Sequence, residues 1–305
     1  MKRLVVLTLV VSLGTVSYLL ARQTPPPRIV EVEKLKDNLF VLKGGGGNTT
    51  VFVQANGITV VDTKNPGWGA PILATIKKIS PKPVNTIINT HTHGDHVSGN
   101  VEFPATVDIV AQANASASMK EMPGVTGFAT LATPAPSIFE QHKGHGLPTR
   151  TFTDRMTLFQ GPDQIDLYYF GRGHTNGDAW VHFPAVRVVS AGDIISGKNL
   201  PLLDANNGGS GLDIGDTIAR AHAAFVTTAD TVVTGHSTNM TLADVLEYAQ
   251  FNHEFATAMR DAKRAGRSVD DVVKTWTMPA KHVGYAPAAE ARLRSNVQVL
   301  YDEIR

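Results

Sequence analysis

Short hydrophobic runs rich in β-branched residues alternate with turn residues over the first part of the chain, and this pattern predicts β-strands. The expected strands are 28–32, 39–43, 49–54, 58–62, 84–88 and 107–110. Asn56-Gly57, between the third and the fourth, is a hairpin signal because both residues tolerate positive φ. Apolar residues at helical spacing predict helices over 71–79 and 111–122.

A second strand-rich stretch follows, with strands expected at 156–159, 165–170, 179–183 and 186–190. Between the two stretches, residues 123–150 are rich in Pro, Gly, Ser and Thr, and we expect a long irregular insertion there. Beyond Thr217 the pattern becomes helical, with helices expected at 218–226, 242–265, 269–275 and 288–304. Two strand-rich halves, each followed by helices, indicate a layered α/β architecture with sheet packed on sheet and helices outside.

The N-terminus has the pattern of a targeting segment. Lys2 and Arg3 precede an uncharged apolar run over 4–21, and a polar, proline-rich exit follows up to residue 27. This order is typical of a secretory signal, so we expect a periplasmic or secreted protein. The run over 4–21 is just long enough to span a bilayer, so an uncleaved anchor is the alternative, and only then do we expect membrane contact. We therefore divide the chain into the signal or anchor over 1–27, a main domain over 28–240 and a helical segment over 241–305 that packs on the same domain.

The composition excludes several kinds of partner and chemical site. The 305 residues include 28 Lys and Arg against 27 Asp and Glu, so the net charge of +1 gives no electrostatic reason to expect nucleic acid as a partner. The chain has no cysteine, which excludes disulfides, iron–sulfur clusters, thiolate zinc ligands and cysteine nucleophiles. A metal site must therefore be built from His, Asp and Glu, and the expected partner is a small-molecule substrate.

One run of residues carries the main chemical signal. His91-Thr92-His93-Gly94-Asp95-His96 comes shortly after the expected strand 84–88. Imidazole and carboxylate groups are ligands of zinc and related cations. Alternate side chains of an extended segment share a face, so His91 and His93 can reach one ion. The turn allowed by Gly94 directs Asp95 and His96 toward a second ion.

Three further residues of ligand type lie at turns or strand ends. His174 lies in the glycine-rich turn Gly171-Arg172-Gly173-His174, before another expected strand. Asp193 and His236 each follow an apolar strand, in Ala191-Gly192-Asp193 and in Val233-Thr234-Gly235-His236. Because α/β folds place their sites at the carboxyl ends of strands, we expect these side chains to join the first run.

This ordered set of motifs resembles the five-motif pattern of the metallo-β-lactamase superfamily, with Asp62 in Val60-Val61-Asp62-Thr63 matching the motif that precedes the histidine run. The resemblance covers residues near 28 to 240 and implies an αββα sandwich of two mixed β-sheets with helices on the outer faces. It also implies two Zn²⁺ ions per chain. By this likeness, His91, His93 and His174 would hold the first zinc. Asp95, His96 and His236 would hold the second, Asp193 would bridge both, and Asp62 would fix the ligand loop.

The resemblance implies a zinc-dependent hydrolase. Our hypothesis is that a hydroxide held between the two metals attacks the carbonyl of an ester, lactone, thioester or β-lactam. Asp95 would orient this nucleophile or carry its proton. The best-known β-lactamase subclass has a cysteine where Asp193 stands, whereas an aspartate there resembles glyoxalase II and lactonases. Two alternatives remain: a mononuclear iron persulfide dioxygenase of the same fold, and a metal-binding protein without turnover.

Two residues are candidates for substrate binding. Lys198 could anchor a substrate carboxylate, and His145, in the insertion over 123–150, could line the pocket. The glycine run over 44–47 lacks the Lys-Ser/Thr ending of a phosphate-binding loop. We therefore expect the glycine run to be a flexible rim over the metal site or a simple break between strands.

Overall fold

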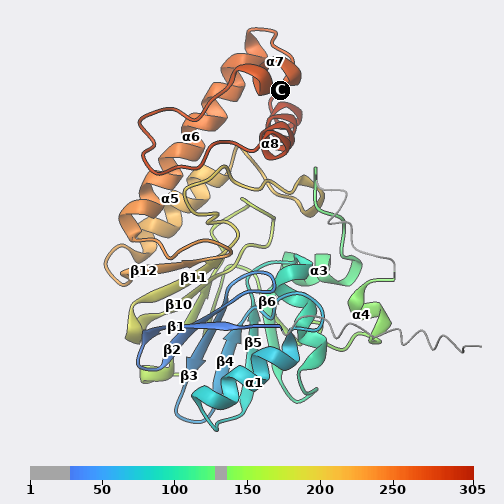
Figure 1. Ribbon diagram of the computed structural model, residues 1–305, viewed down its shortest axis with the longest axis vertical. Helices are drawn as coiled ribbons and strands as arrows, with labels where there is room; N and C mark the ends of the chain where they lie inside the picture. Colours follow the sequence, from blue (N-terminus) through green and yellow to red (C-terminus); the bar gives the residue numbers. More distant parts are fainter. Residues whose placement is uncertain (1–27, 128–135) are drawn as a thin grey trace, which may run out of the picture.

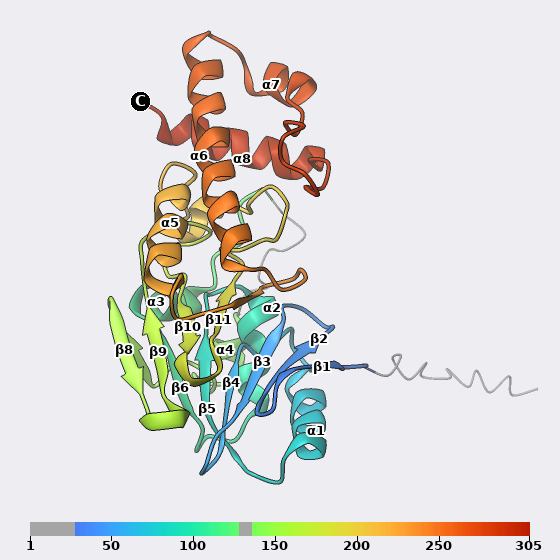
Figure 2. The same cartoon turned by 90° about the vertical axis from the view of Figure 1, so that its left-hand side faces the viewer.

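Two β-sheets pack face to face, and helices cover their outer faces (Figures 1 and 2). The computed structural model describes residues 28–127 and 136–305. The first sheet contains, in this order, β1 (Glu31–Lys36), β2 (Leu39–Lys43), β3 (Thr49–Val53), β4 (Ile58–Val61), β5 (Val84–Asn89), β6 (Asp108–Gln112) and β7 (Arg150–Phe152). The second contains, in this order, β12 (Thr231–Thr234), β11 (Val188–Gly192), β10 (Trp180–Phe183), β9 (Ile165–Tyr168) and β8 (Arg155–Leu158).

Both sheets are mixed. Strands β1 to β4 pair antiparallel and β4 to β7 pair parallel. In the second sheet β8 to β11 pair antiparallel, and β11 pairs parallel with β12. The predicted αββα sandwich of two mixed sheets is therefore confirmed. The arrangement brings the carboxyl ends of β4 and β5 in one sheet, and of β11 and β12 in the other, to edges where loops can meet.

Alternation along the strands builds the core on both faces of the first sheet. Val61 and Ile88 face the second sheet, in a cluster with Val181 and Val233, whereas the preceding residues of β4 and β5 face the other way. On that outer face they pack under α1 (Gly69–Ile79) through Ile72 and its neighbours. Each strand is therefore apolar on both sides, which explains its continuous hydrophobic run in the sequence.

The outer face of the second sheet is covered by α5 (Ile214–Phe225) and α6 (Leu242–Arg264). A single hydrophobic cluster joins Trp180 of β10 to these helices and to Val297 of α8 (Glu290–Glu303). Together with α7 (Val269–Thr275), α6 and α8 stand at one end of the molecule, at the top of Figures 1 and 2. The remaining α-helices of the described residues are α2 (Gly94–Val97), α3 (Ala113–Glu121) and α4 (Ile138–Gln141).

Two expectations from the sequence need correction, and a third falls on residues that the structure does not describe. The first strand begins at Glu31 rather than at residue 28, because its partner β2 ends at Lys43, which pairs with Glu31. The stretch over 123–150 is not irregular throughout: α4 buries Phe139, and β7 begins at Arg150. Residues 128–135 and the predicted signal or anchor over 1–27 lie outside the described residues. Across the ranges that are described, no helix has the length and apolar character that a bilayer crossing requires.

Candidate metal centre

The predicted ligands reach one edge of the sandwich from four loop segments. Strand β5 ends at Asn89, and the run from His91 to His96 follows it and enters α2. Asp193 comes directly after β11, and His236 lies just beyond the end of β12. His174 comes from the loop between β9 and β10. Segments from both sheets therefore meet at this edge.

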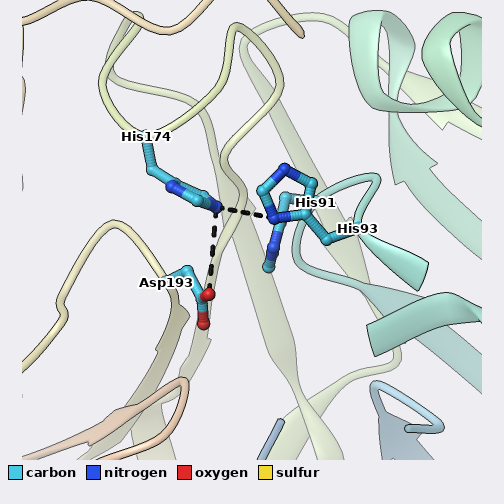
Figure 3. Close-up of side chains that lie close together, drawn as sticks. All are labelled: His91, His93, His174 and Asp193. Carbon is cyan, nitrogen blue, oxygen red and sulfur yellow. Dashed lines mark hydrogen bonds and ion pairs between the residues drawn. The ribbon is translucent and has the colours of Figure 1, made fainter. Parts of the chain in front are cut away.

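The first group of ligand atoms belongs to His91, His93, His174 and Asp193, whose side chains converge in Figure 3. One ligand atom from each lies within 4.8 Å of the others. His174 Nε2 is 3.1 Å from His93 Nδ1 and 3.9 Å from Asp193 Oδ2. All four residues are buried, so the group forms an enclosed, polar site.

The second group of ligand atoms belongs to Asp95, His96 and His236. His236 Nε2 is 3.1 Å from Asp95 Oδ2 and 3.2 Å from His96 Nε2. Asp193 joins the two groups, since its Oδ1 is 3.1 Å from His96 Nε2 and its Oδ2 is 3.3 Å from His236 Nε2. The structure therefore places Asp193 between the two sets of side chains that the sequence predicted as ligands.

Each buried imidazole of these groups has one nitrogen held by a fixed neighbour. His96 Nδ1 donates to Asp62 Oδ2 at 2.7 Å, and His174 Nδ1 donates to the Leu202 carbonyl at 2.6 Å. His93 Nε2 donates to Asp204 Oδ2 at 2.7 Å. When the ring is neutral, as a metal ligand must be, such a contact selects the tautomer in which the opposite ring nitrogen carries a lone pair, and in all three rings that nitrogen faces the ligand groups.

Asp62 orients the loop. Its Oδ1 accepts from the Thr90 backbone N–H, and its Oδ2 accepts from both the Thr90 hydroxyl and His96 Nδ1. The Thr90 hydroxyl oxygen lies 3.0 Å from His91 Nδ1 and can accept from it. Asp62 thus fixes two of the histidines, one directly and one through Thr90.

The donor atoms fit a divalent cation. In the tautomers set by Asp204 and Leu202, His93 Nδ1 and His174 Nε2 face each other with lone pairs at 3.1 Å, and a cation between them removes the repulsion. Two ligands of a tetrahedral zinc with bonds of about 2.0–2.1 Å would be about 3.3 Å apart. His91 Nε2 is buried without a hydrogen-bond partner among the described residues, and such an atom needs a ligand.

The two groups differ in charge. Burial and neighbouring imidazoles hold the pKa of His91 well below its usual value, and burial lowers the pKa of His174 to about 4, so both rings are neutral and ready to bind a metal. Burial also opposes charge on His236, but the carboxylates of Asp193 and Asp95 outweigh it and raise the pKa of His236 to about 9. A cation in the second group must therefore displace protons, so its binding there strengthens as the pH rises.

Access to the site is one-sided. The His96 and His174 side chains are fully buried, whereas the side chain of His236 is 45% exposed and that of Asp95 is 32% exposed. Solvent and any substrate therefore approach over the second group, beside Asp95 and His236.

Several supporting residues were not predicted. Asp204 is fully buried and accepts from the backbone and hydroxyl of Thr126 as well as from His93. The glycine run also has a structural role: Gly47 N donates to the Asp95 carbonyl at 3.0 Å, and the Gly47 backbone lies against the ring of His96. Asn48 then holds the loop around His236 through the Thr234 and Ser237 carbonyls. The glycine run thus separates β2 from β3, as one of the two expectations had it, and also borders the metal site, as the other had it.

The two predicted substrate-binding residues have partners of their own. Lys198 Nζ lies 3.2 Å from both Asp244 Oδ1 and Glu247 Oε2 on α6. His145 Nε2 donates to the Phe103 carbonyl at 3.0 Å. The structure places neither in the two ligand groups, and their roles toward a substrate stay predictions.

Comparison with known proteins identifies the family. The model of the metallo-beta-lactamase superfamily matches residues 42–236, so the chain belongs to this superfamily, and the resemblance of the motifs is confirmed. A metallo-beta-lactamase type 2 from Elizabethkingia meningoseptica is 27% identical over 178 residues, which cover 54% of this chain and 62% of that protein. The chain thus matches less than two thirds of this curated relative.

Solved structures show the same fold at low identity. The inverting sec-alkylsulfatase Pisa1 from Pseudomonas sp. superimposes with a TM-score of 0.70 and 14% identity over 90% of this chain and 50% of its own length. A metallo-beta-lactamase from Pontibacter korlensis superimposes with a TM-score of 0.57 and 19% identity over 73% of this chain and 99% of its own length. The wider sulfatase match must include part of the C-terminal helices, since 241–305 is more than a tenth of the chain.

Proposed function

We propose that the protein is a two-zinc hydrolase that attacks the carbonyl of an ester, lactone, thioester or β-lactam. The observation that carries this proposal is the position of Asp193, whose carboxylate oxygens lie 3.1 Å from His96 Nε2, 3.9 Å from His174 Nε2 and 3.3 Å from His236 Nε2, so that it joins both ligand groups. His91, His93, His174 and Asp193 would hold one ion, and Asp95, His96, His236 and Asp193 the other. The donors are nitrogen and oxygen only, which suits zinc, iron or manganese.

When bound, divalent cations supply a nucleophile at neutral pH by lowering the pKa of coordinated water, and they polarise the substrate oxygen. The protein's own contribution centres on Asp95. Burial would raise the pKa of its carboxyl, but His96 and the hydrogen bond from His236 outweigh burial and lower that pKa to about 2. In the metal-free protein Asp95 therefore stays ionised on the exposed side of the site, where its carboxylate can orient the attacking water.

A second candidate activity is hydrolysis of a sulfate ester. It is favoured by the likeness to the sec-alkylsulfatase, which extends over 90% of this chain with a TM-score of 0.70. The same ligand groups could serve either reaction, because both need an activated water and a stabilised anionic leaving group. The choice between a carbonyl substrate and a sulfate ester therefore depends on the loops around the exposed side of the site.

The test combines metal analysis with a substrate screen on one sample. We expect two zinc ions per chain and hydrolysis of at least one compound in a panel of nitrocefin, lactones, thioesters, carboxylic esters and a secondary alkyl sulfate. His93→Ala and Asp193→Ala should lose metal and at least about 100-fold in rate, because each removes a ligand. His142→Ala is the matched control, since the His142 side chain is exposed and, among the described residues, bonds only to the Ile138 carbonyl.

The outcomes separate the alternatives. If the protein hydrolyses only the alkyl sulfate, its activity is the second candidate, hydrolysis of a sulfate ester, and not attack on a carbonyl. One iron and no zinc per chain, with thiol-dependent oxygen consumption, would establish the dioxygenase instead. Bound metal without activity across the panel would favour a binding protein. Full hydrolysis by a His93→Ala protein that retains both metals would contradict the assignment of the ligands.

Export is part of the proposal. The support is the sequence alone, in which Lys2 and Arg3 precede the apolar run over 4–21 and the proline-rich exit. We expect the protein in the periplasm or the medium, with a mature N-terminus between residues 21 and 28. Intact Met1 on a protein in the membrane fraction would establish the anchor, and intact Met1 on a cytoplasmic protein would refute export.

A further inference from the structure

Helix α8 lies beyond the residues that the superfamily model matches, yet its side chains bind the loop that supports the metal ligands. The family match ends at residue 236, and α8 spans Glu290–Glu303. On this helix Asn296 is fully buried although it is polar. A buried amide is retained only where its hydrogen bonds are made, so its partners indicate its role.

Asn296 holds the backbone on both sides of Leu202. Its Nδ2 donates to the Pro201 carbonyl at 2.7 Å, and its Oδ1 accepts from the Leu203 backbone N–H at 3.4 Å. Between these two contacts the Leu202 carbonyl accepts from His174 Nδ1 at 2.6 Å. A single side chain of α8 therefore fixes the peptide that selects the tautomer of one predicted metal ligand.

The same loop carries the group that orients a second ligand. Asp204 follows Leu203, and its carboxylate accepts from His93 Nε2 at 2.7 Å. Its backbone N–H donates to the His174 carbonyl at 3.0 Å, so the loop and the His174 turn are tied together. Any shift of the backbone over 201–204 would move the acceptors of both rings.

Other residues of α8 hold the loop and its surroundings. Glu303 Oε2 accepts from the Gly211 and Leu212 backbone N–H groups at 2.8 and 3.1 Å, at the far end of the loop. Glu303 lies seven residues after Asn296, which places both on one face of the helix. Ser295 donates to the Thr126 carbonyl at 3.4 Å, and Thr126 in turn donates to Asp204.

We propose that α8, through Asn296, is a positioning element of the metal centre: it sets the carbonyl of Leu202 and the carboxylate of Asp204 that aim His174 and His93. The hydrogen bonds of the Asn296 side chain go to the loop and not to His174 or His93, so it acts through the loop. The inference rests on the metal centre of the proposed function, and it assigns to the C-terminal helices a role in metal binding in addition to their packing.

The test measures metal affinity in the full-length protein. In Asn296→Leu, competitive zinc titration should show one of the two binding steps weakened about tenfold, the low end of the range found when a direct hydrogen-bond partner of a metal ligand is removed, because Asn296 acts one contact further out. The visible absorption spectrum of the cobalt(II) form should change as well, because the geometry of one site changes. Leu293→Ala is the matched control: Leu293 is a buried core residue of the same helix, so its loss destabilises the fold while the hydrogen bonds to the loop remain.

A second variant keeps the test decisive if Asn296→Leu does not fold. Asn296→Asp retains the acceptor for Leu203 and removes the donor to Pro201, and we expect it to weaken the same binding step by a smaller factor. Wild-type affinity and an unchanged cobalt spectrum in the Asn296 variants would overturn the positioning role, as would equal effects in Leu293→Ala. A wild-type protein that binds no metal would overturn the proposed function together with this inference.

Discussion

Asp62 shows how one residue meets both a backbone and a chemical requirement at this site. Its φ of 62° lies in the left-handed region, which Asp and Asn tolerate better than most residues. Both carboxylate oxygens are used, by Thr90 and by His96 Nδ1. The substitution Asp62→Asn therefore changes the hydrogen bonding without adding backbone strain.

In Asp62→Asn we expect metal binding by the second ligand group to weaken about 10- to 100-fold, or about 1–3 kcal/mol. The side-chain amide of Asn has one acceptor oxygen, so it cannot replace both of the carboxylate oxygens that hold Thr90 and His96. The orientation of His96 is therefore lost. Asp166→Asn is the control, since Asp166 is also buried and bonds to Thr157, Gln164 and Arg155 rather than to a histidine of the site. Zinc titration of the two variants gives the comparison, and equal affinities would refute the role of Asp62.

Lys64 is a fully buried lysine next to this motif. Its Nζ donates to the Leu42 and Gly47 carbonyls at 2.8 and 2.6 Å. Burial lowers the pKa of Lys64 to about 8, although the carboxylates of Asp62 and Asp95 act in the opposite direction. The neutral amine still has two N–H groups, enough for both carbonyls.

The lowered pKa predicts the sign of a pH effect on stability. Between about pH 8 and 10.5 the unfolded chain holds the Lys64 proton that the folded protein has lost, so the free energy of unfolding rises with pH. The comparison is Lys64→Met, in which residue 64 keeps the same backbone conformation but cannot titrate. Between about pH 8 and 10.5, the free energy of unfolding of the metal-free wild type should rise by about 3 kcal/mol relative to that of this variant. Denaturant unfolding at several pH values measures the difference, and parallel curves for the two proteins would show that Lys64 has an ordinary pKa.

At the scale of elements, the loop between β2 and β3 acts as a wall of the site. Gly44, Gly45 and Gly46 have positive φ values of 94°, 76° and 125°, which only glycine adopts readily. Gly47 is different, because its backbone is not in the left-handed region and its requirement is steric. A Cβ atom at Gly47 would overlap the ring of His96.

In Gly47→Ala we expect the ring of His96 to be displaced and metal binding by the second group to be lost or weakened at least about tenfold. Gly161→Ala is the control: nothing lies near the added carbon, and its φ of 61° costs only about 1 kcal/mol of backbone strain. Zinc stoichiometry after dialysis distinguishes the two variants. Two tightly bound ions in Gly47→Ala would show that the loop does not constrain His96.

Across the whole molecule, the sequence predicted the features that depend only on residues close together in the chain. The continuous apolar runs located the strands, and the predicted range 39–43 coincides with β2. Strand β7 was missed because three residues are too few to show a period, and its pairing with β6 is what defines it. The limits of β1 follow from its partner rather than from its own residues.

The same distinction applies to the site. The ligand-type residues could be found because they lie in one short run, close after strands or, for His174, in a glycine-rich turn, and the structure brings them together. Asp204 and Asn296 could not be found, because their importance comes from contacts with distant segments. Asp204 is 111 positions from His93, and Asn296 is 95 positions from Pro201. No local pattern marks a buried polar residue whose partner is another loop.

Bound metal should also stabilise the molecule as a whole, because the ligands come from both sheets and are gathered only in the folded state. Metal at 100 times its dissociation constant adds about 2.7 kcal/mol per site. We therefore expect a chelator to lower the thermal midpoint by at least about 5 °C, and added zinc to restore it. The midpoint of Asp193→Ala should respond much less, and an identical midpoint of the wild type with and without chelator would argue against structural coupling.

The most direct test of the central claim is anomalous X-ray scattering at the zinc absorption edge from crystals of the zinc-loaded protein. We expect two peaks, one among His91, His93 and His174 and the other among Asp95, His96 and His236, with Asp193 between them. A single peak, or zinc bound elsewhere with these side chains unliganded, would contradict the two-metal account.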